Sequence, residues 1–331
     1  MPGISSSKIA IPFGAGGISW SDYWTTLISA TVETAAPTHV VLTFPTAQTA
    51  LGAADFTIAG FTIASASWTG AVLTIVLTEA VLIFDCGLVI TFERTGETAA
   101  VVNNVADDGD TVGLYDYKDL SGSLISSWTD RTGLNHHLLQ AGADNLKPTL
   151  TADGVLFDGV RQYLNASFAY VQPIEIYLLF KIVTFASPKY IYDGSTADKT
   201  ALYMADLSPV IRVYAGNSSN ENTNMVVGTF SIVRALFNGA SGEFQVDDTA
   251  EMTGNWGANN AGGFWLGGSN QPGVYSNICV KNVILRKAAA SAGLITAINN
   301  CLKKKNNESL MDSVPEVISD KFNLPMIVKV K

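Results

Sequence analysis

The segment EIYLLFKIV at residues 175–183 decides the fold of this chain, together with FSIVRALFN at 230–238 and ICVKNVILRK at 278–287. All three are rich in β-branched, aromatic and other apolar residues, a composition typical of buried β-strands. Shorter runs of the same kind surround them, among them LYDYKDL, KYIYDG, VIRVYAG and GEFQVDD. From about Gly113 to Asn307 the sequence therefore predicts two curved sheets packed face to face.

One helix is predicted after these strands. In ASAGLITAINNCLKKK, residues 290–305, apolar side chains recur at helical spacing. Lys303 to Lys305 stand at its C-terminal end, where they complement the negative end of the helix dipole. A single late helix after many strands indicates an all-β protein.

Ordered landmarks in the same region resemble the concanavalin A-like, laminin-G-like family. They begin with a tryptophan, an aspartate, a Thr-Gly pair and a histidine, continue with a V-x-F-D-G-x-x-x-Y-L segment, and close with Leu-Gly-Gly, a tyrosine and an apolar strand before a short helix. The residues that carry the resemblance are Trp128, Asp130, Thr132, Gly133, His137, Val155, Phe157, Asp158, Gly159, Tyr163, Leu164, Leu266, Gly267, Gly268, Tyr275, Ile278, Val283, Ile284 and Leu285. The resemblance implies a jelly-roll sandwich of the lectin and glucanase type over residues 113–307.

Residues 29–104 predict a second, smaller sandwich. Apolar and polar residues alternate in HVVLTF, VLTIVL and LVITF, as half-buried antiparallel strands require, and turn signals such as Pro45 and Gly60 separate the runs. The segments ATVETAAPTHVVLTF at 30–44 and LGAADFTIAGFTI at 51–63 resemble bacterial and phage Ig-like domains. This resemblance implies an Ig-like β-sandwich.

Length and charge limit the function classes. A chain of 331 residues is comfortable for two domains that each bury a core. Its net charge of −9 argues against nucleic-acid binding, which needs a basic surface. Cys86, Cys279 and Cys301 are odd in number and lack metal-ligand spacing, so we expect buried free thiols rather than disulfides or a zinc site.

Three segments lie outside the two predicted sandwiches. Residues 1–28 combine glycines with Trp20, Tyr23 and Trp24, and we interpret them as an attachment arm that docks onto a partner or onto its own domain. Residues 105–112 form the linker, where Asp107, Asp108 and Asp110 leave a calcium site open as an alternative, although the later glutamate of an EF-hand loop is missing. Residues 308–331 form a tail that ends in PMIVKVK, a short alternating segment able to add to a sheet edge.

We predict no catalytic residues and no cofactor. Glycoside hydrolases with a jelly-roll fold need two carboxylates close together, and the nearest candidates are in GEFQVDDTAE at 242–251. Glu243 and Asp247 would share a strand face, whereas Asp248 would point away and Glu251 would lie beyond the turn. The required pair is therefore not expected to form.

Sugar binding is the alternative chemistry. An exposed aromatic ring can stack on a sugar while amide and backbone groups bind its hydroxyls. The candidates are Trp256 with Asn255, Asn259 and Asn260, and the loop that contains Asn217 and Asn220. The competing interpretation is that both are polar surface loops, with the tryptophan folded into the core.

The combined pattern resembles the structural proteins of tailed bacteriophages. The first thirty residues do not have the pattern of a signal peptide, and no segment is as long as a membrane span. We therefore expect a non-enzymatic virion protein, made in the host cytoplasm and present in many copies or as a homo-oligomer. It would serve as a head decoration, head fibre or tail component, with other virion proteins and a host-surface glycan as partners. Two alternatives stay open: a bacterial surface carbohydrate-binding or adhesin protein, and a purely architectural virion subunit.

Overall fold

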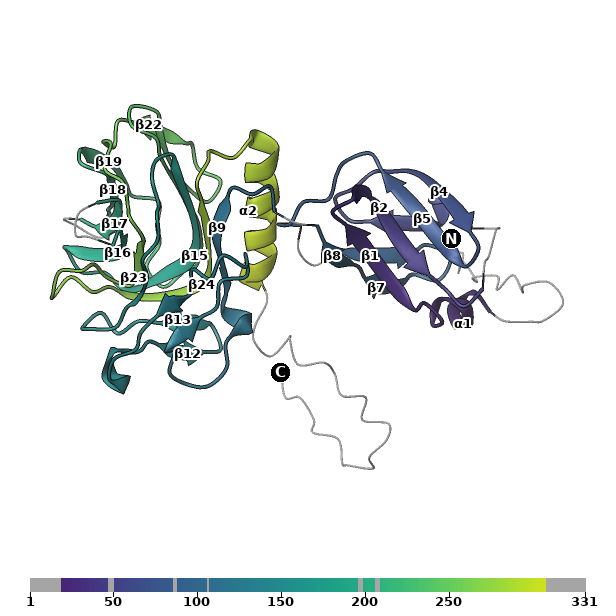
Figure 1. Ribbon diagram of the computed structural model, residues 1–331, viewed down its shortest axis with the longest axis horizontal. Coiled ribbons are helices and arrows are strands. Elements are labelled where there is room, and N and C mark those ends of the chain that lie inside the picture. The colour runs from purple at the N-terminus through teal and green to yellow at the C-terminus, as the bar shows by residue number, and fades with distance from the viewer. Residues whose placement is uncertain are drawn as a thin grey trace, which may run out of the picture. The chain divides into compact units, whose positions relative to one another are not determined.

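The computed structural model describes residues 19–46, 51–85, 88–105, 107–195, 199–205 and 209–307, without the side chains of 218–221 (Figure 1). The predicted fold class is confirmed: the described chain is mostly β-strand, in sheets that pack as sandwiches, with one longer helix at the C-terminal end. It divides into two compact units, and the divisions along the chain fall between Asp108 and Gly109, between Ser291 and Ala292, and between Cys301 and Leu302. Most of the predicted arm and the whole predicted tail lie outside the described residues.

The first unit contains a short helix and two sheets. One sheet has the strand order β4-β5-β2-β1-β8, and the other has the order β3-β6-β7. Its apolar core contains alternate residues of facing strands, such as Val40 and Leu42 from one sheet and Ile90 and Phe92 from the other. The elements are α1 (Trp20–Trp24), β1 (Ser29–Glu33), β2 (Ala36–Thr43), β3 (Phe56–Ile58), β4 (Ile63–Thr69), β5 (Val72–Leu77), β6 (Val89–Phe92), β7 (Glu97–Ala100) and β8 (Val102–Asn104).

The second unit contains two larger sheets. One runs β10-β11-β14-β23-β16-β17-β18-β19, and we call it the front sheet; the other runs β12-β13-β24-β15-β20-β21-β22, with β9 also paired to β24, and we call it the back sheet. The strands are β9 (Thr111–Asp116), β10 (Ser127–Trp128), β11 (Leu138–Leu139), β12 (Thr149–Thr151), β13 (Gly154–Leu156), β14 (Leu164–Ala166), β15 (Ile174–Thr184), β16 (Lys189–Asp193), β17 (Ala201–Met204), β18 (Ile211–Tyr214), β19 (Ser218–Asn222), β20 (Ser231–Phe237), β21 (Gly242–Val246), β22 (Met252–Gly254), β23 (Phe264–Leu266) and β24 (Asn277–Arg286). The helix α2 (Ala292–Asn307) is shared: its residues 292–301 group with the first unit and residues 302–307 with the second.

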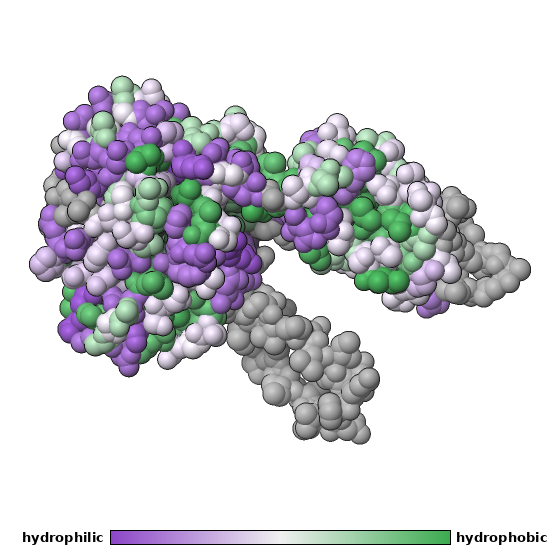
Figure 2. Space-filling view, in the orientation of Figure 1, coloured by the Kyte–Doolittle hydropathy of each residue, from purple (hydrophilic) through white to green (hydrophobic). Residues whose placement is uncertain are grey.

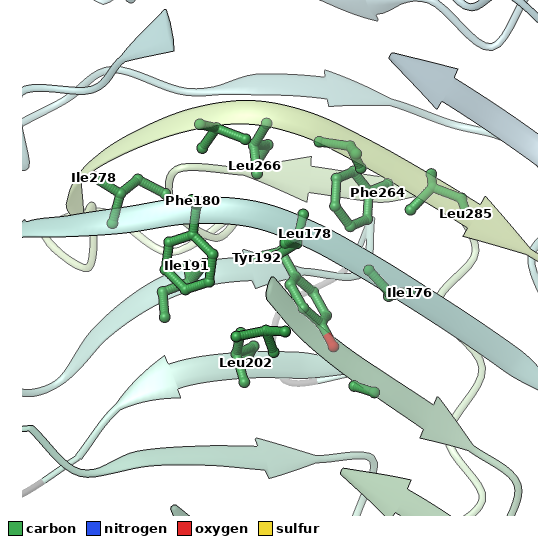
Figure 3. Packing of buried hydrophobic residues seen from close by; sticks show 14 of the residues in the cluster. Ile176, Leu178, Phe180, Ile191, Tyr192, Leu202, Phe264, Leu266, Ile278 and Leu285 are labelled. Carbon is green, nitrogen blue, oxygen red and sulfur yellow. The ribbon is translucent and has the colours of Figure 1, made fainter. Parts of the chain in front are cut away.

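One continuous core holds the two large sheets together. Ile176, Leu178 and Phe180 of β15 in the back sheet belong to the same buried cluster as Phe264 and Leu266 of β23 and Ile191 of β16 in the front sheet (Figure 3). These side chains are almost completely buried, and burying one such side chain contributes about 1.5–3 kcal/mol. The inner face of the front sheet is thus occupied by the core, which leaves its outer face for other uses.

The end of α2 is fixed to the back-sheet side of the second unit. Lys303 forms a 2.7 Å ion pair with Asp248, and Lys281 donates to the carbonyl oxygen of Asn306 at 2.7 Å. Lys303, predicted to complement the helix dipole, therefore also binds a carboxylate far away in the sequence. Among the described residues, no helix is long and apolar enough to cross a membrane.

Residues that carry the concanavalin A-like resemblance have structural roles. The Trp128 indole is fully buried and donates to the carbonyl oxygen of Asp116 at 3.0 Å. Asp158 accepts three backbone N–H bonds, from residues 160 to 162, at 2.8–3.2 Å. A side chain at Gly267 would collide with the Phe157 ring, 2.3 Å from the added carbon. The motif therefore describes loop closure and packing.

The cysteine prediction needs a correction. Cys279 is a buried free thiol, and burial raises its pKa to about 11. Cys301, however, is disulfide-bonded, so the expectation of free thiols is wrong for this residue. Cys86 lies outside the described residues. Spacing alone could not anticipate the bond, because disulfide formation depends on distance in the fold.

The described surface is mixed in polarity. On the face visible in Figure 2, hydrophilic residues cover much of the second unit, and apolar residues form small separate patches among them. Such scattered apolar residues are normal on a folded protein. A candidate site therefore has to be identified from particular side chains.

Candidate functional site

The N-terminal aromatic residues belong to the core of the first unit. Tyr23 is 3% exposed and stacks on Phe44 at 4.9 Å, while Trp24 is 5% exposed and stacks on Phe92 at 5.2 Å. Trp20 is partly buried against the same core, and the Arg94 guanidinium lies 4.3 Å from the centre of its ring. Their interpretation as partner-attachment residues is therefore wrong for Tyr23 and Trp24, because their rings already fill the space above Phe44 and Phe92.

Trp256 is not available for sugar stacking. Its side chain is 2% exposed and occupies the space next to Gly242 and Gly254. A side-chain carbon at Gly242 would lie 2.0 Å from the indole, so these two glycines make room for the ring. The proposed role of Trp256 is therefore wrong, and the indole is part of the core.

The predicted asparagines do come together. Asn217 donates to the amide oxygen of Asn255 at 3.2 Å, which joins the two predicted loops. Gln172 fixes the same region: its backbone N–H donates to the Asn260 amide oxygen at 2.8 Å, and its side chain donates to the carbonyl of Asn259 at 2.8 Å. These amides therefore hold the loops in place. The side chain of Asn220 lies outside the described residues.

The carboxylates considered for catalysis are arranged differently from the prediction. Glu251 lies beyond the turn after β21, as predicted, yet Arg234 binds both it, at 2.8 Å, and Glu243, at 2.5 Å, so the two carboxylates meet at one guanidinium. The same guanidinium binds the fully buried Glu175 at 2.8 Å. Burial alone would lower the pKa of Arg234, but the nearby Glu175 raises it above its usual value. A permanent positive charge thus lies among the three carboxylates.

The linker aspartates do not form a metal site in the described chain. Within those ranges, no group of three or more His, Cys, Asp or Glu side chains is placed to hold a metal ion, and this includes Asp107, Asp108 and Asp110. The open alternative of calcium at the linker is not supported by this arrangement.

A row of aromatic side chains crosses the outer face of the front sheet. Trp265 lies between the core residues Phe264 and Leu266 on β23, and Tyr203 lies between Leu202 and Met204 on β17. Since successive side chains of a strand point to opposite faces, Trp265 and Tyr203 point outward. Together with three further tyrosines they form what we call the aromatic stripe, made of Tyr163, Trp265, Tyr275, Tyr190 and Tyr203.

The stripe is continuous across four neighbouring strands. Tyr163, just before β14, stacks on Trp265 with ring centres 4.4 Å apart, and lies 6.1 Å from Tyr275. Tyr275 is bridged to Tyr190 of β16, which in turn stacks on Tyr203 of β17 at 5.4 Å. All five side chains are half-buried. The rings therefore contact in two groups, Trp265 with Tyr163 and Tyr275, and Tyr190 with Tyr203, and the backbone bridge between Tyr275 and Tyr190 joins the groups. All of them still expose part of their surface.

A glycine shapes the centre of the stripe. A side-chain carbon at Gly268 would lie 2.6 Å from the Tyr275 ring, so the missing side chain lets this ring lie close to the backbone. Partial burial, with Tyr163 nearby, raises the pKa of Tyr275 above its usual value. The hydroxyl of a tyrosine is protonated at neutral pH even without this shift, so it can donate a hydrogen bond. Asn165 stands directly opposite Trp265 in the β14–β23 register and adds an amide to the same face. Ring surfaces, hydroxyls and an amide are the groups that bind sugars.

Sequence reasoning missed the stripe, although a signal was present. Period-2 alternation in ALYM at 201–204 and FWL at 264–266 places Tyr203 and Trp265 opposite the core. Strand order, which brings these residues next to one another, is not encoded in that alternation.

Comparisons with known proteins give distant matches. No protein-family model matches the chain, and no curated protein matches it in sequence. Among solved structures, it is similar to a Trypanosoma rangeli sialidase with a TM-score of 0.46 and 14% identity, over 61% of this chain and 34% of the sialidase. It is also similar to a GH54 α-L-arabinofuranosidase with a TM-score of 0.44 and 12% identity, over 55% of this chain and 51% of that enzyme. Similarities this distant carry no argument about activity.

Proposed function

We propose that this chain is a non-enzymatic structural protein of a tailed bacteriophage particle, a head decoration, head fibre or tail component, whose second unit adheres weakly to glycans. The observation that carries the adhesive part is the aromatic stripe on the outer face of the front sheet. The virion part rests on the resemblance of the two sandwich modules to phage structural proteins.

The chemistry of the stripe suits weak, reversible adhesion. The exposed parts of the rings offer apolar contact to a sugar, and the tyrosine hydroxyls and Asn165 offer hydrogen bonds. An open row of half-buried rings gives low affinity for one sugar. Many copies on one particle raise the avidity, by roughly 10²–10⁴-fold for linked sites.

The arrangement around Arg234 supports the non-enzymatic part. Glycoside hydrolysis needs one carboxyl group that gives up a proton and another that attacks or activates water. Glu243 and Glu251 each form an ion pair with the Arg234 guanidinium, at 2.5 and 2.8 Å. Both carboxylates are thus engaged by one guanidinium, which lies where a proton donor and a separate nucleophile would have to act.

Two measurements test this proposal. Mass spectrometry and immunogold labelling of purified particles should detect the protein in a fixed copy number, and its absence from particles would refute the virion part. A glycan array probed with a multimerised form of the full chain should show binding that Trp265→Ala removes. If no glycan on the array binds the protein, the purely architectural subunit is favoured. If immunogold labels a bacterial cell surface that carries no particles, the adhesin is favoured.

A further inference from the structure

We propose that the aromatic stripe recognises the interior of an extended, unbranched polysaccharide chain that lies across the strands of the front sheet, rather than the end of a glycan. This inference rests on the glycan adhesion proposed above and specifies its ligand.

The direction of the stripe sets the direction of the ligand. Its rings come from the lines of β14, β23, β16 and β17, which are consecutive neighbours in the front sheet. Neighbouring strands lie about 4.8 Å apart, so the row extends roughly 14 Å across the sheet. A single sugar ring covers only part of that row, whereas an extended chain running perpendicular to the strands can contact all of it.

The shape of the stripe favours binding to the interior of a polysaccharide rather than to its end. Recognition of a chain end requires groups that enclose the terminal sugar, as in a concave pocket. Here the central ring, Tyr275, lies close to the backbone over Gly268, between Tyr163 on one side and Tyr190 on the other. The aromatic stripe therefore continues on both sides of Tyr275. A polysaccharide that contacts Tyr275 with one sugar can contact the stripe with the sugars before and after it.

The stacking within the stripe limits how each ring can bind. Tyr163 and Trp265 are nearly parallel, with 17° between their planes, so each gives one face to the other. Tyr190 and Tyr203 form a second such pair at 24°. Tyr163 is also nearly parallel to Tyr275, at 18°, so it has a stacked neighbour on two sides. The stacked rings leave edges and tyrosine hydroxyls for the ligand, and contacts of this size contribute little individually. Affinity must therefore accumulate along a chain.

Series of oligosaccharides of increasing length, which we call ladders, test the inference directly. The full chain is titrated calorimetrically with cello-, chito- and malto-oligosaccharides, each from the monosaccharide to the hexamer, and with the parent polysaccharides. We expect at least one ladder in which affinity rises with each added sugar until the stripe is covered, and in which the monosaccharide does not compete. Equal affinity for monosaccharide and hexamer would refute interior recognition while leaving glycan adhesion intact.

Variants connect the length dependence to the stripe. Tyr275→Ala, at the centre, should weaken binding of the hexamer by about three- to tenfold. Tyr203→Ala, at one end, should also weaken the hexamer, but by less than Tyr275→Ala does. Phe230→Ala, which removes a half-buried ring beside the back sheet, is the matched control and should change neither. Loss of binding in the control alone, or no binding of any ladder, would refute the assignment to the stripe.

Discussion

Arg234→Met tests how the second unit holds a buried charge cluster. Arg234 is 2% exposed and binds three carboxylates, of which Glu175 is fully buried while Glu243 and Glu251 are 31% and 38% exposed. Methionine preserves much of the side-chain volume but removes every donor. The variant therefore leaves the Glu175 carboxylate without its main positive partner.

The expected cost follows from what remains around Glu175. Breaking a buried ion pair typically costs about 3–5 kcal/mol, because the remaining charge stays out of water. Glu175 keeps the Tyr177 hydroxyl at 3.1 Å and the Ala290 N–H at 2.8 Å, and Arg286 lies 3.6 Å away. These partners place the expected loss near the lower end, at about 3 kcal/mol. The contacts to Glu243 and Glu251 add little, since exposed pairs contribute about 0–1 kcal/mol.

Guanidinium denaturation of the full chain measures this loss. Glu243→Gln is the control for an exposed partner of the same guanidinium and should cost no more than about 0.5 kcal/mol. The double variant of Glu175→Gln with Arg234→Met should be more stable than Arg234→Met alone, because the buried charge is gone. The reasoning is refuted if Arg234→Met costs no more than Glu243→Gln, or if the double variant recovers nothing.

Three further outcomes are expected. Gly268→Ala should push the Tyr275 ring off the backbone, cost about 1–2 kcal/mol and weaken glycan binding, as calorimetry and denaturation would show together. Burial raises the pKa of Tyr23 to about 12, so the folded state keeps its proton while the unfolded chain loses it, and stability falls as pH rises above about 10. Tyr23→Phe should reduce that alkaline fall, and a thermal-unfolding series with no difference between variant and wild type would contradict this. Burial alone would raise the pKa of Asp55, but its hydrogen bonds with Arg94 and with the Gly52 backbone amide lower it. The ionised Asp55 therefore stabilises the folded state above pH 3.8, and this stabilisation is lost as the pH falls through the lower pKa of the folded state. Arg94→Ala should cost about 0.5 kcal/mol at neutral pH and progressively less in acid, as melting temperatures across that range would show.

The sequence alone was sufficient for the fold class. The alternation in VLTIVL indicates a strand with one face covered, and the dense apolar run EIYLLFKIV indicates a strand with both faces covered. Both patterns lie within one segment, so they can be recognised without knowing the tertiary structure. The late helix was also readable, because its apolar spacing and terminal lysines lie within one segment. The ordered Trp128, Asp158 and Gly267 landmarks were visible because each serves loop closure or packing at a fixed place.

Tertiary structure decided the site, since it depends on which segments become neighbours. Trp256 looked exposed in a polar loop, but the pairing of β21 with β22 places Gly242 opposite Gly254, and these two glycines open the space in which it is buried. Trp24 looked free in a glycine-rich arm, yet Phe92 from a distant strand stacks on it. Strand order, which period-2 alternation does not encode, brings the rings of the aromatic stripe together on one face. Local patterning thus determined which face of each strand is buried, and long-range pairing determined which side chains share the exposed face.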